Sequence, residues 1–132
     1  MGYIELQNEL VKKYRIKLDP ESKCRSRTHV HVKQRRICKW KQHASMRSTF
    51  TLLHEIGHCE NNSYKILNRP MRRCEEEFYA TQWAIAKCKE LKLEVPKNII
   101  DRYQRYVYNE LQRGLNHHGS NYPTKEEMAL VW

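Results

Sequence analysis

The chain has 132 residues, and its 25 Lys and Arg outnumber its 15 Asp and Glu to give a formal net charge of +10. This length supports one domain, 1–132, with one modest hydrophobic core. The sequence lacks a run of 18 apolar residues, which excludes a membrane-spanning helix, and its first residues lack the layout of a secretory signal. The five cysteines are an odd number without a C-x-x-C pair, so we expect reduced thiols in a cytoplasmic protein.

The positive charge lies mainly in the N-terminal part of the chain. Residues 1–50 contain 13 Lys and Arg but only 4 Asp and Glu, a balance of +9, whereas residues 51–132 contain 12 and 11, a balance of +1. A basic surface of this kind attracts nucleic acid or an acidic protein. Because no helix-turn-helix, zinc-finger or RNP motif accompanies the charge, a solvated basic surface is the favoured interpretation, with nucleic-acid contact as the alternative.

The first predicted element is an amphipathic helix over residues 3–16. Its apolar residues recur at helical spacing on one stripe: Tyr3, Leu6, Leu10 and Tyr14. We expect the helix to end at Asp19-Pro20, because the residue before a proline is disfavoured in the helical conformation.

Between Cys24 and Lys41 apolar residues alternate with polar ones, which predicts two short strands joined as a hairpin. His29 and His31 lie two apart and therefore share one face of the first strand. They could bind a metal, but a solvated strand face is the favoured interpretation. A zinc site built from Cys24 and Cys38 is disfavoured, because it lacks the usual close pairing of ligands.

The middle of the chain carries His54-Glu55-Ile56-Gly57-His58, an H-E-x-x-H pattern. Residues four apart lie above one another on a helix, so His54 and His58 would direct two imidazoles at one point, where a Zn²⁺ ion can bind. Glu55 would project beside that point as the general base for a water whose pKa zinc lowers to about 7. The alternative is an ordinary amphipathic helix with two surface histidines.

The residues around this motif favour a buried active-site helix. Its apolar flank consists of Phe50, Leu52, Leu53 and Ile56. Ser48 or Thr49 is expected to cap the start of the helix, and the segment 61–63 is expected to end it. Cys59 and Cys88 fall on apolar helix stripes, so we expect both in the core.

Three further helices are predicted after the motif. One runs from about residue 71 or 74 to residue 93, and the next from residue 96 to about residue 114. A polar loop over 116–123 then separates it from a short last helix, Lys125–Trp132, which a capping-box pattern opens.

A zinc hydrolase site needs a third protein ligand, and Glu75, Glu76 and Glu77 are the candidates. The helical stripe through Glu77 contains small or apolar side chains: Ala80, Thr81, Ala84, Cys88 and Leu91. The stripes through Glu75 and Glu76 include Gln82 and Lys87. Glu77 is therefore expected to face inward and bind the metal, whereas a charged first helical turn explains Glu75 and Glu76.

These motifs resemble a known pattern. Leu-Leu-His-Glu-Ile-Gly-His at 52–58, followed by Glu-Phe-Tyr-Ala-Thr-Gln-Trp-Ala at 77–84, is similar to the gluzincin arrangement of HExxH and E-x-x-A-[DN]-x-x-A. Over roughly residues 1–90 the layout resembles the ImmA/IrrE-type metallopeptidases. The resemblance implies an α+β, zincin-like domain in which Glu77 joins the two histidines on zinc. Thr81 stands where the family has Asp or Asn, a residue that usually supports a zinc-bound histidine.

The resemblance also implies a zinc-dependent endopeptidase. Several members cleave a helix-turn-helix repressor and thereby switch on genes of phages, mobile elements or stress regulons, so the implied substrate is a transcriptional repressor. A substrate strand would add to the sheet edge above the zinc, for which the basic hairpin Arg25–Lys41 is the candidate. The alternative function is a basic nucleic-acid- or protein-binding module that retains the zinc site without turnover.

The group that stabilises the transition state is left open. The donors available outside the resemblance are Tyr106, Tyr108, His117 and His118. Core packing is the favoured role for Tyr106 and a polar loop for the two histidines, so none of them is assigned. Residues 95–132 match no feature of the family.

Overall fold

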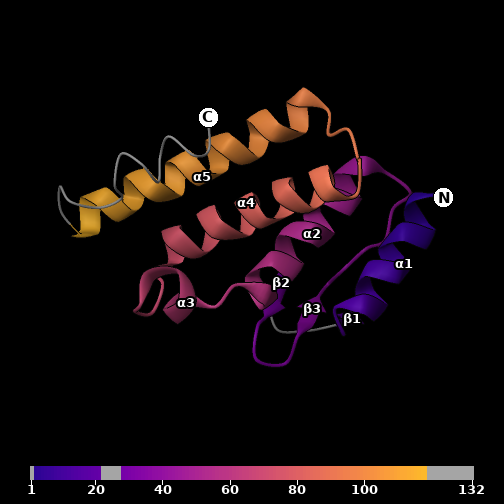
Figure 1. Ribbon diagram of the computed structural model, residues 1–132, viewed down its shortest axis with the longest axis horizontal. Coiled ribbons are helices and arrows are strands. Elements are labelled where there is room, and N and C mark those ends of the chain that lie inside the picture. The colour runs from indigo at the N-terminus through magenta and orange to yellow at the C-terminus, as the bar shows by residue number, and fades with distance from the viewer. Residues whose placement is uncertain (1, 22–27, 119–132) are drawn as a thin grey trace. The chain divides into compact units, whose positions relative to one another are not determined.

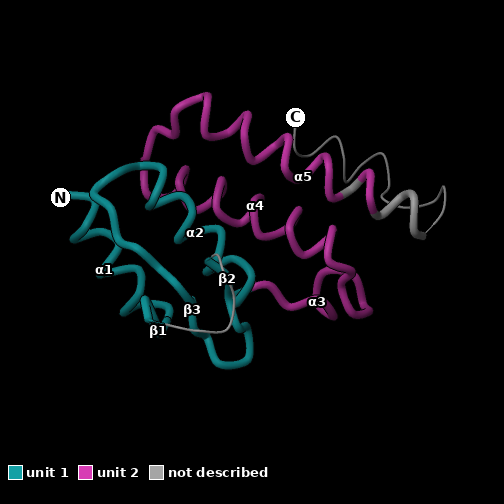
Figure 2. The backbone as a smooth tube through the Cα atoms, turned by 180° about the vertical axis from the view of Figure 1, so that it is seen from behind, with its two compact units in different colours: residues 1–60 teal, residues 61–132 magenta. Residues whose placement is uncertain are grey.

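A computed structural model describes residues 2–21 and 28–118. Contacts along the chain divide it into two compact units, residues 1–60 and 61–132 (Figure 2). The described residues form an α+β structure of five helices and one three-stranded sheet. The elements of the first unit are α1 (Tyr3–Lys13), β1 (Lys17–Asp19), β2 (His29–His31), β3 (Arg36–Cys38) and α2 (Met46–Glu60). Those of the second unit are α3 (Ser63–Leu67), α4 (Arg73–Glu90) and α5 (Lys97–His118). None of the described helices is long and apolar enough to cross a membrane.

The sheet of the first unit has the strand order β1-β3-β2. β2 and β3 pair antiparallel with Val30 opposite Ile37, so the predicted hairpin is confirmed. β1 pairs parallel to β3 with Leu18 opposite Ile37, and the sequence did not predict this strand because three residues are too short for an alternation to be recognised. The three paired apolar residues share one face, and the other face carries polar side chains.

The first unit is held together partly by a buried glutamine. The predicted N-terminal helix is confirmed as α1, and Leu10 on its apolar stripe is buried. Gln7, however, is 0% exposed, and its amide nitrogen donates hydrogen bonds to the Thr49 hydroxyl and the His43 carbonyl, each at 2.9 Å. These bonds tie α1 to the start of α2. The sequence did not predict them, because Gln7 lies beside the apolar stripe.

In the second unit, α4 and α5 lie side by side and run in opposite directions (Figure 1). Cys74, Phe78 and Val107 are buried between them, with Tyr79 packed against the cluster. The helix predicted to end near residue 93 is confirmed as α4. The short helix α3 was not predicted: its N-cap, Asn62, falls in the segment that was expected only to end the preceding helix.

Three expectations for the C-terminal part are corrected or lie beyond the described residues. The helix expected to stop near residue 114 continues to His118, so the loop predicted over 116–123 is wrong for its first three residues. Tyr106 is 38% exposed, so core packing is the wrong role for it, and Tyr108 is also exposed. The last helix predicted over Lys125–Trp132 lies outside the described residues, as do the side chains of the two histidines at 117 and 118.

Candidate metal centre

The helix that carries the H-E-x-x-H motif is α2, and it is deeply packed on its apolar side. Its apolar flank is 0% exposed: Phe50, Leu52, Leu53 and Ile56. The helix starts earlier than expected, and the expected caps are wrong. Ser45 precedes it and its hydroxyl accepts the Ser48 N–H at 3.1 Å, while Ser48 and Thr49 lie inside the helix and are buried. A side-chain acceptor is needed at the start because the first N–H groups of a helix have no partner within it.

His54 and His58 face the same way from consecutive turns of α2. Their ring centroids are 4.8 Å apart and their planes are nearly perpendicular, at 88°. His54 is only 3% exposed and His58 is half-buried, so the alternative of two surface histidines is wrong. Glu55, the proposed base, is half-buried beside them. An imidazole pair at this spacing is the arrangement in which both rings can bind one ion.

Arg35, in the turn between β2 and β3, holds the hairpin against the last turn of α2. Its guanidinium donates to the Tyr14 carbonyl at 3.0 Å and to the Cys59 carbonyl at 3.4 Å, and it lies 3.6 Å from the Glu60 carboxylate. The bond to Cys59 satisfies a carbonyl at the helix end directly after His58. The sequence did not single out Arg35, because in a basic segment one arginine is indistinguishable from surface charge.

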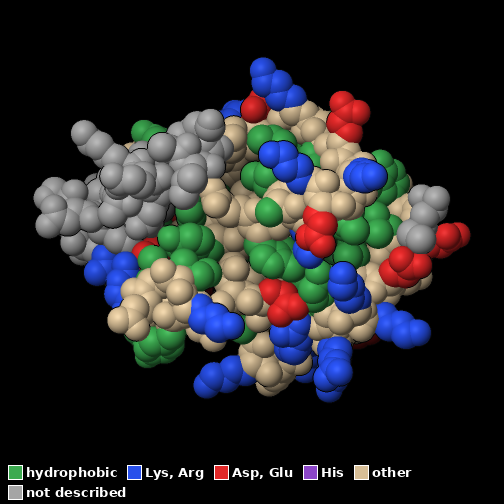
Figure 3. All heavy atoms as spheres, viewed as in Figure 1, with side chains coloured by type: hydrophobic (Ala, Val, Ile, Leu, Met, Phe, Trp, Pro, Cys, Tyr) green, Lys and Arg blue, Asp and Glu red, His purple; other side chains and the backbone are tan. Residues whose placement is uncertain are grey.

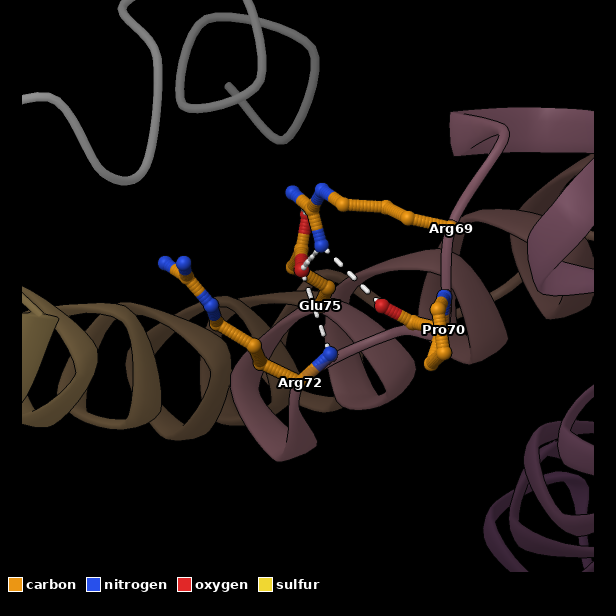
Figure 4. Close-up of polar contacts among 4 residues, drawn as sticks. All are labelled: Arg69, Pro70, Arg72 and Glu75. Carbon is orange, nitrogen blue, oxygen red and sulfur yellow. Dashed lines mark hydrogen bonds and ion pairs between the residues drawn. The ribbon is translucent and has the colours of Figure 1, made fainter.

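The three glutamates at the start of α4 have different surroundings, and the expectation for Glu75 is wrong. Glu75 is 0% exposed rather than solvated. Its two carboxylate oxygens accept hydrogen bonds from the Arg69 guanidinium at 2.7 and 2.8 Å, and one of them also accepts the Arg72 N–H at 3.1 Å (Figure 4). Glu75 is thus engaged in holding the start of α4.

Glu77 is half-buried and Glu76 is exposed. The residues on their helical stripes predicted this order of burial for these two glutamates. The side chains on the stripe through Glu77 are buried at four positions: Ala80, Thr81, Ala84 and Cys88. Glu77 thus starts the packed stripe of α4.

His54 and His58 lie in the first unit and Glu77 in the second, so the structure describes the imidazole pair and the glutamate each within its own unit. The predicted set of His54, His58 and Glu77 would supply two imidazole nitrogens and one carboxylate oxygen, which is the donor set of a catalytic zinc site with one position left for water or substrate. The residues present therefore fit a zinc ion. Within the first unit, His29, His31 and Cys38 offer three metal-ligand atoms that lie within 4.8 Å of one another.

Two of the described thiols on the helices, Cys59 and Cys88, have raised pKa values. Burial raises the pKa of Cys59 to about 11, with Arg35 lowering it and the carboxylates of Glu55 and Glu60 raising it further. Burial likewise raises the pKa of Cys88 to about 11. The expectation of a core position is confirmed for Cys88, whereas Cys59 is only half-buried. Both thiols are therefore protonated and unreactive at neutral pH.

A groove of about 800 Å³ lies in the first unit between the end of β3 and the start of α2. Its charged lining is mostly basic, with Lys39, Lys41 and Arg47 against Glu21. We call it the basic groove. Lys and Arg side chains are also seen along the lower edge of the face in Figure 3. Part of the positive charge predicted for residues 1–50 thus lines a groove in which a negatively charged group could bind.

Comparison of the chain with models of protein families, with curated proteins and with solved structures finds no match to any of them.

Proposed function

We propose that this chain is a zinc-dependent endopeptidase with a zincin-like domain of the ImmA/IrrE type. His54, His58 and Glu77 would hold the zinc, and Glu55 would act as the general base. The observation that carries the proposal is the pair of imidazoles on consecutive turns of α2, with ring centroids 4.8 Å apart and Glu55 half-buried beside them. The intact Glu directly after the first histidine of the motif supports turnover rather than metal binding alone.

When bound, zinc supplies a Lewis acid that polarises the scissile carbonyl and acidifies water. The role of His54 and His58 is to hold the ion with neutral imidazoles, and the burial of His54 keeps that ring in one orientation. Glu55 accepts a proton from the attacking water and returns it to the leaving amine. Its half-buried position beside the histidines is compatible with this role, because a carboxylate in contact with water can exchange protons.

We propose that the substrate is a cytoplasmic regulatory protein, a transcriptional repressor of a phage or mobile element in the first instance. β2 is an edge strand of the sheet, so an extended substrate segment could add to it through main-chain hydrogen bonds. A domain this small has little chain for a deep specificity cleft, so the folded partner would have to position the cut segment.

The second candidate is a basic binding module that keeps the zinc site without turnover. The basic groove is the observation that favours it, because its lysines and arginine can hold a phosphate or an acidic side chain. A salt-dependent DNA-binding assay run beside a proteolysis assay separates the two functions.

Elemental analysis of the purified chain tests the zinc assignment. We expect one zinc lost on Glu77→Ala and on His58→Ala, and kept in Glu75→Gln and in the exposed control Glu76→Ala. Zinc retained in Glu77→Ala but lost from Glu76→Ala would overturn the ligand assignment. Incubation with casein and with a neighbouring repressor, at low and moderate salt, then tests the substrate class: cleavage of the repressor alone supports the proposal, and cleavage of neither favours the binding module.

A further inference from the structure

A second set of metal-donor side chains lies on the sheet, away from the H-E-x-x-H motif in sequence. His29 and His31 come from β2, and Cys38 comes from β3. His29 is directly opposite Cys38 in the antiparallel register, and His31 lies two residues further along the same strand. Directly opposed residues and residues two apart project from the same face of a sheet. The register itself therefore gathers the three side chains.

These three side chains lie on the polar face of the sheet, whereas Val30 and its partner Ile37 lie on the apolar face. Cys38 is nevertheless 0% exposed, and the two histidines are half-buried. A thiol on a polar face would ordinarily contact water. Here the thiol is closed off from solvent, with the two imidazoles among its neighbours.

The geometry of the donors fits one ion. One ligand atom from each of the three residues lies within 4.8 Å of the others. The His29 and His31 rings have centroids 5.0 Å apart and planes inclined at 74°, so they converge edge to face rather than stacking flat. Ligand atoms around a tetrahedral ion with bonds of about 2.0 to 2.3 Å lie under 4 Å apart, so small side-chain rotations bring the set to bonding distance.

The nearby charges permit a cation. Arg36 lies opposite His31 on the same face, but its guanidinium is 3.9 Å from the Asp19 carboxylate of β1, which offsets its charge. Metal binding would release the Cys38 proton, and the resulting thiolate adds one negative charge to the site. Two imidazoles and a thiolate form a donor set that selects zinc and related first-row ions over magnesium or calcium.

We propose that His29, His31 and Cys38 form a second, structural metal site that takes Zn²⁺ and clamps β2 to β3. Strands of three residues pair weakly, so an ion shared by both strands would hold the edge strand in register. The site stands independently of the proposed peptidase activity, because it shares no ligand with the H-E-x-x-H helix.

Cobalt titration of the metal-free full-length chain tests the site, because Co²⁺ replaces Zn²⁺ and a thiolate ligand gives it an intense near-ultraviolet charge-transfer band. We expect the band to saturate within two Co²⁺ per wild-type chain, because two donor sets take up the ion, and to be displaced by Zn²⁺. It should vanish in Cys38→Ser and persist in the cysteine controls Cys24→Ser and Cys88→Ser. It should also persist in His54→Ala/His58→Ala, which removes the other donor set and so separates the two proposals.

His29→Ala/His31→Ala provides a second test that spares the buried thiol, should Cys38→Ser fail to fold. Both histidines are half-buried, so the double variant is expected to fold. Loss of two of three ligands should weaken formation of the cobalt band by about 100-fold or more. A wild-type chain without the band at saturating Co²⁺, a band that survives Cys38→Ser, or unchanged affinity in the double histidine variant would each overturn the second site.

Discussion

Replacing Arg69 by methionine tests whether the buried carboxylate of Glu75 depends on its partner. The substitution removes both charge-assisted hydrogen bonds, at 2.7 and 2.8 Å, and leaves Glu75 with the Arg72 N–H. Removing one partner of a buried ion pair typically costs about 3 to 5 kcal/mol, because the other charge stays buried. The Arg69 side chain is 41% exposed, so water can enter its place. We therefore expect a loss of about 2 to 3 kcal/mol in the free energy of unfolding.

Urea unfolding followed by far-ultraviolet circular dichroism, with a chelator present, measures this loss at a fixed metal state. The control is Arg73→Met, which removes an exposed arginine from the first turn of the same helix and should change stability by less than about 0.5 kcal/mol. The double variant Arg69→Met/Glu75→Gln should be more stable than Arg69→Met alone, because a neutral amide replaces the uncompensated charge. If Arg69→Met and Arg73→Met have equal effects, the explanation of the buried pair is refuted.

The remaining predictions concern catalysis, pH and packing. Glu55→Gln should keep its zinc by elemental analysis but lose hydrolysis, because the amide cannot accept a proton; unchanged turnover would contradict its role as base. The pKa of Cys88 is raised from 9.0 to about 11, so its protonated thiol stabilises the fold below pH 9 and that contribution is lost as the pH rises through 11. The difference in the free energy of unfolding between wild type and Cys88→Ala should therefore narrow by about 1 kcal/mol between pH 8 and pH 10. A difference that does not change with pH would contradict the raised pKa of Cys88. Gln7→Met should cost about 1 to 2 kcal/mol in thermal or urea unfolding, because the His43 carbonyl loses its amide donor; a neutral effect would show that water replaces the bond.

The spacing of apolar residues predicted much of the secondary structure. The stripe through Leu10, the alternation around Val30 and the apolar flank of α2 each predicted an element that the structure contains. The boundaries were less well predicted, because helix ends depend on single contacts. Ser45 rather than Ser48 caps α2, and α5 continues four residues past Gly114. β1 was missed because its pairing with β3, rather than any pattern of its own, makes it a strand.

The amino-acid sequence by itself determined the H-E-x-x-H spacing, the ranking of Glu77 as more inward than Glu76, and the basic character of residues 1–50. Each of these follows from the order of residues within one element, which is what a periodic pattern records. Only the tertiary structure decided that Glu75 is buried against Arg69 and that Cys38 lies opposite His29. Those facts depend on which segments meet across a loop or a strand pair. The spacing of apolar residues does not record which polar partners meet. The sequence therefore placed Glu75 in a solvated first turn and assigned Cys38 to no site.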